Sequence, residues 1–449
     1  MMSNSELPSY LSMARPNPPE KRAPWYKNTA PAYAGIFLWV VFYMTIANGT
    51  LSQAGLGVSL LGLVAAALIC HFLFYLVPGL LGMKTGYPLY VVGSSTYGTS
   101  GGFLMPGLLM GLLQFGWLAV NIAVSTDFIL QAFGKPPVQD PITGVFEPSV
   151  AFTIVAIFWA VLAVLVAVMG IQYVGRVSTL LPVVPLFMIL IVFLANVGSA
   201  GKFRPAAGGN TLDGFLRMIT IVVGFFATAG AAGVDFGMSN RNKKDVQLGG
   251  LVGVALAAIL AGGLPLVAIA GAHAADPLIK SFSFDAVIRE QGGLLARSMF
   301  ILFAITSFAP ACFSTFIGGN SIATLFPKIN KTVMVSVGAG LAAILAITGK
   351  AMNLVGVFGI IGASFGPVCG SMFADYFLSG RKWAGPRKGW NMAGWIAWAV
   401  GFVVGIAPLV GLFNVPAAPL AAFIVGAVLY ALLAKIGLQP ATLNMPQNA

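Results

Sequence analysis

The segment GFFATAGAAG, residues 224–233, is rich in small residues although it lies in the middle of a long apolar stretch. A second segment of this kind, IANGTLSQAGLG at residues 46–57, ends the first apolar stretch of the chain. Small residues let neighbouring backbones approach closely, and clustered glycines weaken a helix. The places of these two segments in the order of apolar stretches therefore decide how the fold is interpreted.

The composition is that of a protein embedded in a membrane. Of the 449 residues, 58% are hydrophobic and only 8% are charged, whereas a soluble domain carries about 25% charged residues. Apolar stretches recur from about residue 30 to residue 436, each with about the 20 residues that a membrane-crossing helix needs. The sequence therefore predicts an all-α polytopic membrane protein in contact with the lipid bilayer.

Twelve membrane-spanning helices are predicted. The polar N-terminal tail, residues 1–29, has no apolar stretch of signal-peptide type, so we expect it in the cytoplasm. In this orientation 16 of the 24 Lys and Arg residues fall on the inner side and 8 on the outer side, which is the positive-inside pattern. Both termini are then on the inner side of the cytoplasmic membrane, and the net charge of +12 requires no nucleic-acid partner. The predicted spans are residues 30–52, 57–82, 102–133, 149–170, 173–197, 212–238, 246–272, 293–317, 332–349, 352–379, 389–409 and 418–436.

Residue types that carry chemistry are scarce. The three cysteines, Cys70, Cys312 and Cys369, lie in predicted spans without metal-ligand spacing, and the chain has only two histidines, far apart. A membrane-embedded enzyme needs clustered His, Asp, Glu or Cys at the middle of the bilayer. We therefore expect no enzymatic activity, no cofactor, and no metal beyond a possible sodium ion.

The two segments rich in small residues suggest an internal symmetry. Because five spans separate them, residues 30–197 and 212–379 form two candidate five-helix inverted repeats, followed by two additional helices in residues 389–436. Broken helices at equivalent places in two halves are typical of the midplane binding site of a transporter. The alternative is that these glycines only permit close helix packing.

A polar stripe interrupts the third predicted span. In QFGWLAVN, residues 114–121, the side chains of Gln114, Trp117 and Asn121 share one face of a helix because their spacing is i, i+3, i+7. An unpaired polar group in hydrocarbon costs several kcal/mol, so the stripe requires a reason. We interpret it as a stacking surface flanked by amides that bind a flat polar ligand. The alternative is that the amides join helices to one another.

The sixth predicted span offers a second aromatic surface. Phe225 and Phe226 follow Gly224 at its centre, and aromatic faces from two helices can hold a planar heterocycle between them. If the helix unwinds near Gly224, free backbone groups there can bind the edge of the ligand. The alternative is that this is ordinary apolar packing.

The eighth predicted span contains hydroxyl groups around a proline. In TSFAPACFST, residues 306–315, Pro310 frees a carbonyl one turn earlier, and Thr306, Ser307 and Ser314 supply hydroxyl oxygens. Oxygens of this kind can hold a monovalent cation. They can equally satisfy the backbone of a kinked helix.

Asp235 follows the small-residue segment and precedes the basic loop SNRNKK at residues 239–244. We expect it to pair with Arg176 or with the basic loop as an inner gate, or to end the helix near water. This gate or structural role is preferred over that of a proton carrier.

The chain resembles the nucleobase–cation symporters, the group of cytosine, purine and hydantoin permeases. The resemblance covers about residues 30–436 and depends on the order and spacing of its motifs rather than on any one of them. Four stretches carry it: GMKTGYPLYVVGSSTYGTSG (82–101), LQFGW (113–117), VVGFFATAGAAGVDFGMSNRN (222–242) and GASFGPVCGSMFADYFLSGRKW (362–383).

The resemblance implies the five-plus-five inverted-repeat fold of leucine-transporter type, with a site between spans 1, 3, 6 and 8. Trp117 takes the place of the family's base-stacking Trp, and Gln114 that of an edge-recognising Gln. Asn121 falls where a hydantoin permease carries a substrate-binding amide. Phe226 corresponds to the aromatic residue that closes the sandwich, with Phe225 as its neighbour.

The coupling ion, Na+ or H+, is left open by the resemblance. Members that use sodium place Ser/Thr pairs in span 8, and one alignment puts Ala309 and Pro310 at those positions. A shift of three residues places Thr306 and Ser307 there instead. Both alignments remain possible from the sequence.

Two further positions follow from the same resemblance. The first span is expected to contribute to the cation site through residues 36–40, which include Phe37. The base-binding Asn of cytosine permeases falls at Ala311 or Cys312, so the exact base is also undetermined.

The sequence therefore predicts a secondary-active, cation-coupled symporter that imports a nucleobase or a similar planar heterocycle. One alternative is a permease of the same fold for amino acids or other small solutes, which has less need of an aromatic sandwich. A second alternative is a channel, which conducts current without saturable uptake. The oligomeric state is not determined by the sequence.

Overall fold

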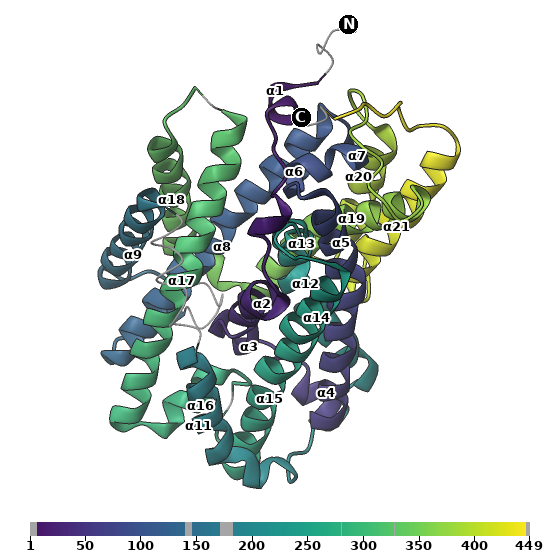
Figure 1. Cartoon of the computed structure of the whole chain (residues 1–449). Helices are drawn as coiled ribbons and strands as arrows, with labels where there is room; N and C mark the ends of the chain where they lie inside the picture. The colour runs from purple at the N-terminus through teal and green to yellow at the C-terminus, as the bar shows by residue number, and fades with distance from the viewer. Residues whose placement is uncertain (1–6, 140–145, 171–182, 280, 327, 446–449) are drawn as a thin grey trace, which may run out of the picture.

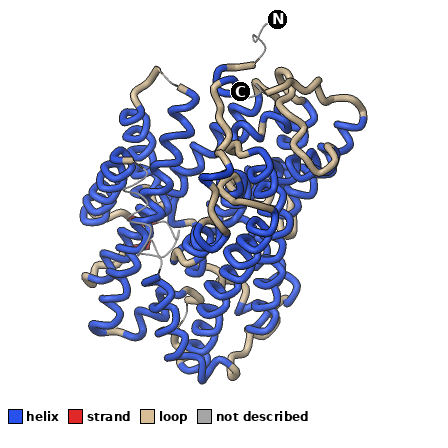
Figure 2. The backbone as a smooth tube through the Cα atoms, in the orientation of Figure 1, coloured by secondary structure: helices blue, strands red, loops and turns tan. Residues whose placement is uncertain are grey.

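The computed structural model describes residues 7–139, 146–170, 183–279, 281–326 and 328–445. These residues form a bundle of helices, most of them running between its two ends (Figures 1 and 2). One short hairpin interrupts the helical pattern, in which strand β1 (Val138–Gln139) pairs antiparallel with β2 (Phe146–Glu147).

Nine helices in the described part of the chain are each long and apolar enough to cross a membrane, by length and composition. Several contain a π-helical turn, labelled η. They are Leu51–Thr85 (α4 Leu51–Ile69, η3 Cys70–Tyr75, α5 Leu76–Thr85), Phe103–Ala132 (η4 Phe103–Leu108, α8 Leu109–Ala132), α9 Val150–Met169, α11 Val183–Ala200, α12 Thr211–Ala231, Lys243–Ala275 (α14 Lys243–Gly250, η5 Leu251–Leu256, α15 Ala257–Ala275), Gly293–Ala323 within α17 Gly293–Leu325, α19 Leu354–Leu378 and α21 Ala418–Lys435.

The remaining helices are shorter. Those with apolar sequences are α18 (Lys331–Ile347) and α20 (Met392–Ile406). The others are α1 Ser9–Ser12, α2 Thr29–Phe37, α3 Val40–Met44, α6 Leu89–Val92, α7 Ser94–Tyr97, α13 Gly233–Gly237, α16 Phe284–Gln291 and the 3-10 helices η1 Pro19–Lys21, η2 Trp25–Lys27 and η6 Lys350–Met352.

The predicted all-α polytopic membrane fold is confirmed by these helices. The number of twelve spans, the tail at residues 1–29 and the limits of the two repeats and of the C-terminal pair stay predictions. The predicted fifth span begins in residues 171–182, which lie outside the described residues, and α11 continues it.

The first predicted span is broken in its middle. It consists of α2 (Thr29–Phe37) and α3 (Val40–Met44), separated at Leu38 and Trp39, where the backbone of Trp39 is extended (ψ 126°). Residues 46–50 of the glycine-rich segment form the following turn, and residues 51–57 begin α4, which is kinked at Gly55; Gly49 and Gly55 are both at φ +72°. The break therefore comes before the segment whose composition suggested it.

The sixth predicted span is also broken, but not where the sequence suggested. The helix does not unwind near Gly224, which was the condition for free backbone groups there, because α12 continues to Ala231 and a turn at Ala232 separates it from α13 (Gly233–Gly237). A Cβ atom on Gly224 would lie 2.6 Å from the Phe358 carbonyl oxygen of α19. At this position the glycine serves close helix packing, which is the alternative that the sequence left open.

A buried ion pair joins several elements at the end of the bundle that carries α6 and α7 (Figure 1). Arg387 Nη2 lies 2.9 Å from Asp375 Oδ1, and both side chains are about 5% exposed. Ser95 Oγ donates to Asp375 Oδ2 at 2.6 Å, and the Arg387 guanidinium donates to the Ser95 carbonyl oxygen. Asn391 Nδ2 donates to the Thr96 carbonyl oxygen at 2.9 Å. These contacts fasten α7 to α19 and to the start of α20.

Replacing Arg387 with Met is expected to destabilise the protein strongly. The substitution leaves the Asp375 carboxylate buried without its counter-charge, a change that costs about 3–5 kcal/mol in buried pairs. The measurement is the thermal unfolding midpoint of the detergent-solubilised protein.

The control is Arg241→Met. Arg241 also pairs with a carboxylate, that of Asp245 at 2.9 Å, but its own side chain is half exposed. Because water screens an exposed pair, the unfolding midpoint of this control should fall far less. Equal losses of the unfolding midpoint in the two variants would show that the buried ion pair contributes no more to stability than the half-exposed pair.

Candidate functional site

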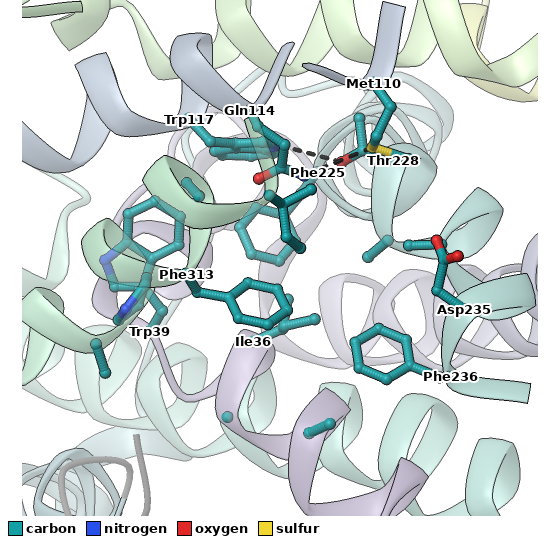
Figure 3. Close-up of a pocket in the computed structure, with 18 of the residues that line it drawn as sticks. Ile36, Trp39, Met110, Gln114, Trp117, Phe225, Thr228, Asp235, Phe236 and Phe313 are labelled. Carbon is teal, nitrogen blue, oxygen red and sulfur yellow. Dashed lines mark hydrogen bonds between the residues drawn. The ribbon is translucent and has the colours of Figure 1, made fainter. Parts of the chain in front are cut away.

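A cavity of about 320 Å³ lies between the broken helices and two continuous ones. Figure 3 shows its side chains grouped around one space, with Gln114 and Trp117 on one side and Asp235 on another. The lining comes from α2 and the following Trp39, from α8, from α12 and α13, and from α17. The lining residues are Pro31, Ala32, Gly35, Ile36, Trp39, Met110, Gln114, Trp117, Phe225, Thr228, Ala229, Ala232, Asp235, Phe236, Ala309, Pro310, Phe313, Ser314 and Ile317.

The cavity extends from the middle of the bundle toward one end. It is lined by the first half of the broken first span, from Pro31 to Trp39, and by the last part of the broken sixth span, from Phe225 to Phe236. Beyond the cavity, in the second half of the broken first span, Phe42 packs against Phe225, with ring centroids 5.0 Å apart. The cavity thus lies toward the predicted cytoplasmic end.

Trp117 is held in place by contacts on two sides. Its Nε1 donates a hydrogen bond of 3.0 Å to Thr228 Oγ1 of α12. Its ring meets Phe225 edge to face, with centroids 5.3 Å apart and an angle of 75° between the planes. No planar ligand fits between two rings in this arrangement, so a ring that closes a sandwich with Trp117 must come from another lining residue.

Phe226 does not line the cavity. It is fully buried and stacks on Phe37, with ring centroids 5.5 Å apart and planes only 10° from parallel. Adjacent residues on a helix point about 100° apart, so Phe225 faces the cavity while Phe226 packs against α2. Of this predicted aromatic pair, the structure brings Phe225 to the cavity, and it places Phe226, Phe37 and Gly224 in the packing around it.

Gln114 is a polar side chain with unused hydrogen-bonding capacity at the cavity wall. Within the described residues, its only side-chain hydrogen bond runs from Nε2 to Met110 Sδ at 3.6 Å (Figure 3), and a thioether is a weak acceptor. Ser314 of α17 also lines the cavity and is largely buried. These groups can donate to and accept from a ligand without losing a strong partner.

Asn121, by contrast, uses both ends of its amide within the protein. Its Nδ2 donates to the Ser307 carbonyl oxygen at 2.6 Å, and its Oδ1 accepts from Trp159 Nε1 at 3.0 Å. It lies outside the cavity lining and joins α8 to α9 and α17. In this arrangement Asn121 is a link between helices, the alternative that the sequence left open for the amides.

The predicted cation-binding residues divide between two places. Ala309 and Pro310 line the cavity, and α17 continues through Pro310. Thr306 Oγ1 donates back to the Phe303 carbonyl oxygen at 3.1 Å, and Ser307 Oγ accepts a 3.2 Å hydrogen bond from Trp39 Nε1. Ser307 therefore faces the break in the first span, where a cation site between spans 1 and 8 is expected.

Asp235 of α13 lines the cavity and accepts a hydrogen bond of 2.9 Å from the backbone N–H of Leu89, at the start of α6. Its predicted partner Arg176 lies outside the described residues. The basic loop does not supply a partner among the described residues, because Arg241 pairs with Asp245 instead. The contact with α6 agrees with a structural role at the inner end of the cavity.

Several lining residues were not identified from the sequence. The most important is Trp39, which lies at the break in the first span and meets Trp117 edge to face at 5.6 Å. A tryptophan in the middle of an apolar stretch, away from the membrane interface, is the signal that marked Trp117 and could have marked Trp39 as well. Thr228, Phe313 and Phe236 have no comparable sequence signal.

Comparison with known proteins identifies the family. The family model described as permeases for cytosine/purines, uracil, thiamine and allantoin matches residues 16–429. The chain belongs to this family. Its members are permeases rather than enzymes, as the scarcity of catalytic residue types predicted.

Individual relatives are more distant from this permease. The cytosine permease of Escherichia coli (strain K12) is 26% identical over 309 residues, which are 68% of this chain and 67% of the relative. The inward-facing conformation of Mhp1 is similar in fold, with a TM-score of 0.73, 17% identity, and coverage of 98% of this chain and 95% of Mhp1.

Two further solved structures share the fold. Mhp1, a nucleobase-cation-symport-1 family transporter, in a closed conformation with bromovinylhydantoin bound gives a TM-score of 0.66 at 17% identity, covering 96% of both chains. A Na+-coupled sialic acid symporter in an outward-open state gives 0.57 at 12% identity, covering 98% of this chain and 94% of the other. These likenesses confirm the predicted transporter fold.

The two amides of this permease should respond differently to substitution. We expect Asn121→Leu to lower the free energy of unfolding by about 1–3 kcal/mol, because it leaves the Trp159 N–H and the Ser307 carbonyl without partners. Gln114→Leu removes only a weak sulfur contact and should leave stability nearly unchanged. Thermal unfolding in detergent measures both, and a larger loss for Gln114→Leu would contradict the assignment of the two roles.

Proposed function

We propose that this permease is a secondary-active, cation-coupled symporter that imports a nucleobase or a similar planar heterocycle by alternating access. The observation that carries the proposal is the cavity wall in which Trp117 offers an indole and Gln114, one turn earlier on α8, offers a free amide. An aromatic face and an amide edge are the two groups by which proteins bind a base.

The size and the lining of the cavity agree with such a ligand. Its volume of about 320 Å³ is at the lower end of the range of roughly 300–1,000 Å³ for small-molecule sites. Trp39 adds aromatic surface from the break in the first span, and Phe313 adds it from α17. Trp39 meets Trp117 edge to face, as Phe225 does, so Phe313 is the candidate for the second face of a sandwich, in the role first predicted for Phe226.

The lining is unsuitable for an amino acid. No Lys, Arg or His is among the described residues that line the cavity. The carboxylate of an amino acid requires a cation, a metal ion or free helix-end N–H groups, and Asp235, the one charged group of the described lining, can pair only with its ammonium. A neutral heterocycle meets no such penalty, so the amino-acid alternative is less well supported.

The relatives support the same choice of substrate class. The curated relative from Escherichia coli is a cytosine permease, and the solved structure of similar fold holds a hydantoin, which is also a planar heterocycle.

Coupling to a cation is part of the proposal. Ser307 and Thr306 of α17 and the break at Leu38 and Trp39 are the groups that would hold Na+ if sodium is used. Coupling arises when ion and substrate each bind more tightly to the same conformation, because each then shifts the population toward the state that the other prefers.

Uptake into proteoliposomes tests the substrate and the ion together. The purified permease is reconstituted and offered cytosine, adenine, uracil and hydantoin, each under a Na+ gradient alone and under a pH gradient alone. Saturable uptake of one of these compounds, reduced by unlabelled competitor bases but not by amino acids, is the expected result. Current without saturable uptake would support a channel instead.

Trp117→Ala is expected to reduce uptake strongly while the protein still inserts into the membrane. Stacking of a base on an aromatic side chain contributes about 1–3 kcal/mol, so affinity should fall by about 5- to 150-fold. The measurement is binding of the transported base to the purified variant. Trp390→Ala is the matched control, since Trp390 is half exposed at the start of α20, and normal uptake by the Trp117 variant would exclude the stacking role.

A further inference from the structure

Asp235 is the only ionisable side chain among the described residues that line the cavity. The other lining residues are aromatic, aliphatic or neutral polar groups. In Figure 3 its carboxylate lies at the edge of the same space that Gln114 and Trp117 border. A carboxylate in such surroundings depends on cavity water, or on a bound positive charge, for stabilisation.

No described cationic side chain neutralises this carboxylate. Its only hydrogen bond within the described residues comes from the Leu89 N–H. Two described basic groups at this end of the bundle, Lys84 and Arg22, have other partners. Lys84 Nζ donates to the Arg381 carbonyl oxygen, and Arg22 donates to the Met83 carbonyl oxygen. Within the described part of the chain, the negative charge at the cavity wall therefore has no counter-charge other than one that enters the cavity.

The titratable neighbours of Asp235 are two tyrosines. The charge of Asp235 acts electrostatically on Tyr33 of α2 and on Tyr90 of α6. The hydroxyl of Tyr33 donates to the Ala229 carbonyl oxygen at 2.8 Å. Helix α5 also packs against α13, and its charged residue, Lys84, is hydrogen-bonded to the Arg381 carbonyl oxygen. The last turn of α12 and the α8 and α17 residues that line the cavity contain no titratable side chain. Among the described residues, Asp235 is thus the one carboxylate placed to exchange a proton with the cavity.

We propose that Asp235 binds the proton that drives substrate uptake. The proposal rests on the function proposed above and identifies its coupling ion as H+. One proton from the outer solution binds a carboxylate oxygen of Asp235 when the site faces outward, and the same proton leaves to cytoplasmic water when the cavity faces inward. One positive charge then crosses the membrane with each neutral base.

Desolvation supplies the coupling. In the empty cavity, water solvates the charged carboxylate. A planar base that fills the cavity displaces this water, which disfavours the charged form and favours the protonated one. Linkage is reciprocal, so protonation of Asp235 strengthens base binding by the same factor. The Leu89 N–H can remain bonded to the other oxygen throughout, which leaves the contact between α13 and α6 intact.

Asp235→Asn is the decisive substitution, because asparagine keeps an oxygen for the Leu89 N–H but cannot bind the proton. Wild-type proteoliposomes should accumulate the base about tenfold for each unit of an inwardly directed proton gradient. The variant should lose this accumulation and only equilibrate the base. It should still exchange internal labelled base for external unlabelled base, since exchange requires no net proton movement.

The controls separate this inference from the function on which it rests. Asp285→Asn changes a carboxylate of α16 that pairs with Arg289 away from the cavity, and it should accumulate base like the wild type. Proton-driven accumulation by Asp235→Asn, or loss of exchange and base binding together in a folded variant, would overturn the proton role.

Wild-type protein provides a second test that does not depend on the folding of the variant. Adding the base to wild-type proteoliposomes should alkalinise the outer medium, with one proton entering per base. Base uptake without proton movement would refute the inference alone, whereas no uptake or binding of any planar heterocycle would refute the proposed function itself.

Discussion

A polypeptide can leave the helical conformation inside a bilayer only where its freed backbone groups are enclosed by protein or face a water-filled cavity. This constraint governs the structure described here. The first span breaks at Leu38 and Trp39, and the sixth turns at Ala232, and both interruptions border the same cavity. The continuous helices α8 and α17 form its other walls, so the site exists because two helices are broken and two are not.

Two indole N–H groups at this site each form a hydrogen bond between a broken helix and a continuous one, with the donor on the broken helix in one case and on the continuous helix in the other. Trp39, from the broken first span, donates to Ser307 of continuous α17, and Trp117, from continuous α8, donates to Thr228 of broken α12. Each bond satisfies a polar group that would otherwise be buried in an apolar wall, and each fixes the plane of a large ring. The orientation of the aromatic surface is thus set by contacts between the broken and the continuous helices.

The sequence predicted the membrane fold well because hydrophobic length and charge asymmetry are properties of the chain itself. The predicted spans end within a few residues of most observed helices, and the Lys and Arg distribution that predicts the orientation can be counted without any contacts. It predicted the breaks less well. Glycines at residues 224–233 pointed to Gly224, but the carbonyl oxygen of Phe358 occupies the space beside that residue, so the helix stays continuous there.

The sequence by itself determined that this chain is a polytopic membrane protein, that it belongs among the base permeases by its motifs, and that Gln114 and Trp117 share one face of a helix. Only the tertiary structure decided which polar and aromatic groups are free. Gln114 and Asn121 are chemically alike, yet one faces a cavity and the other is saturated by α9 and α17. Phe225 and Phe226 differ in the same way, because neighbours from other helices, rather than residue type, determine whether a side chain meets a ligand or a packing partner.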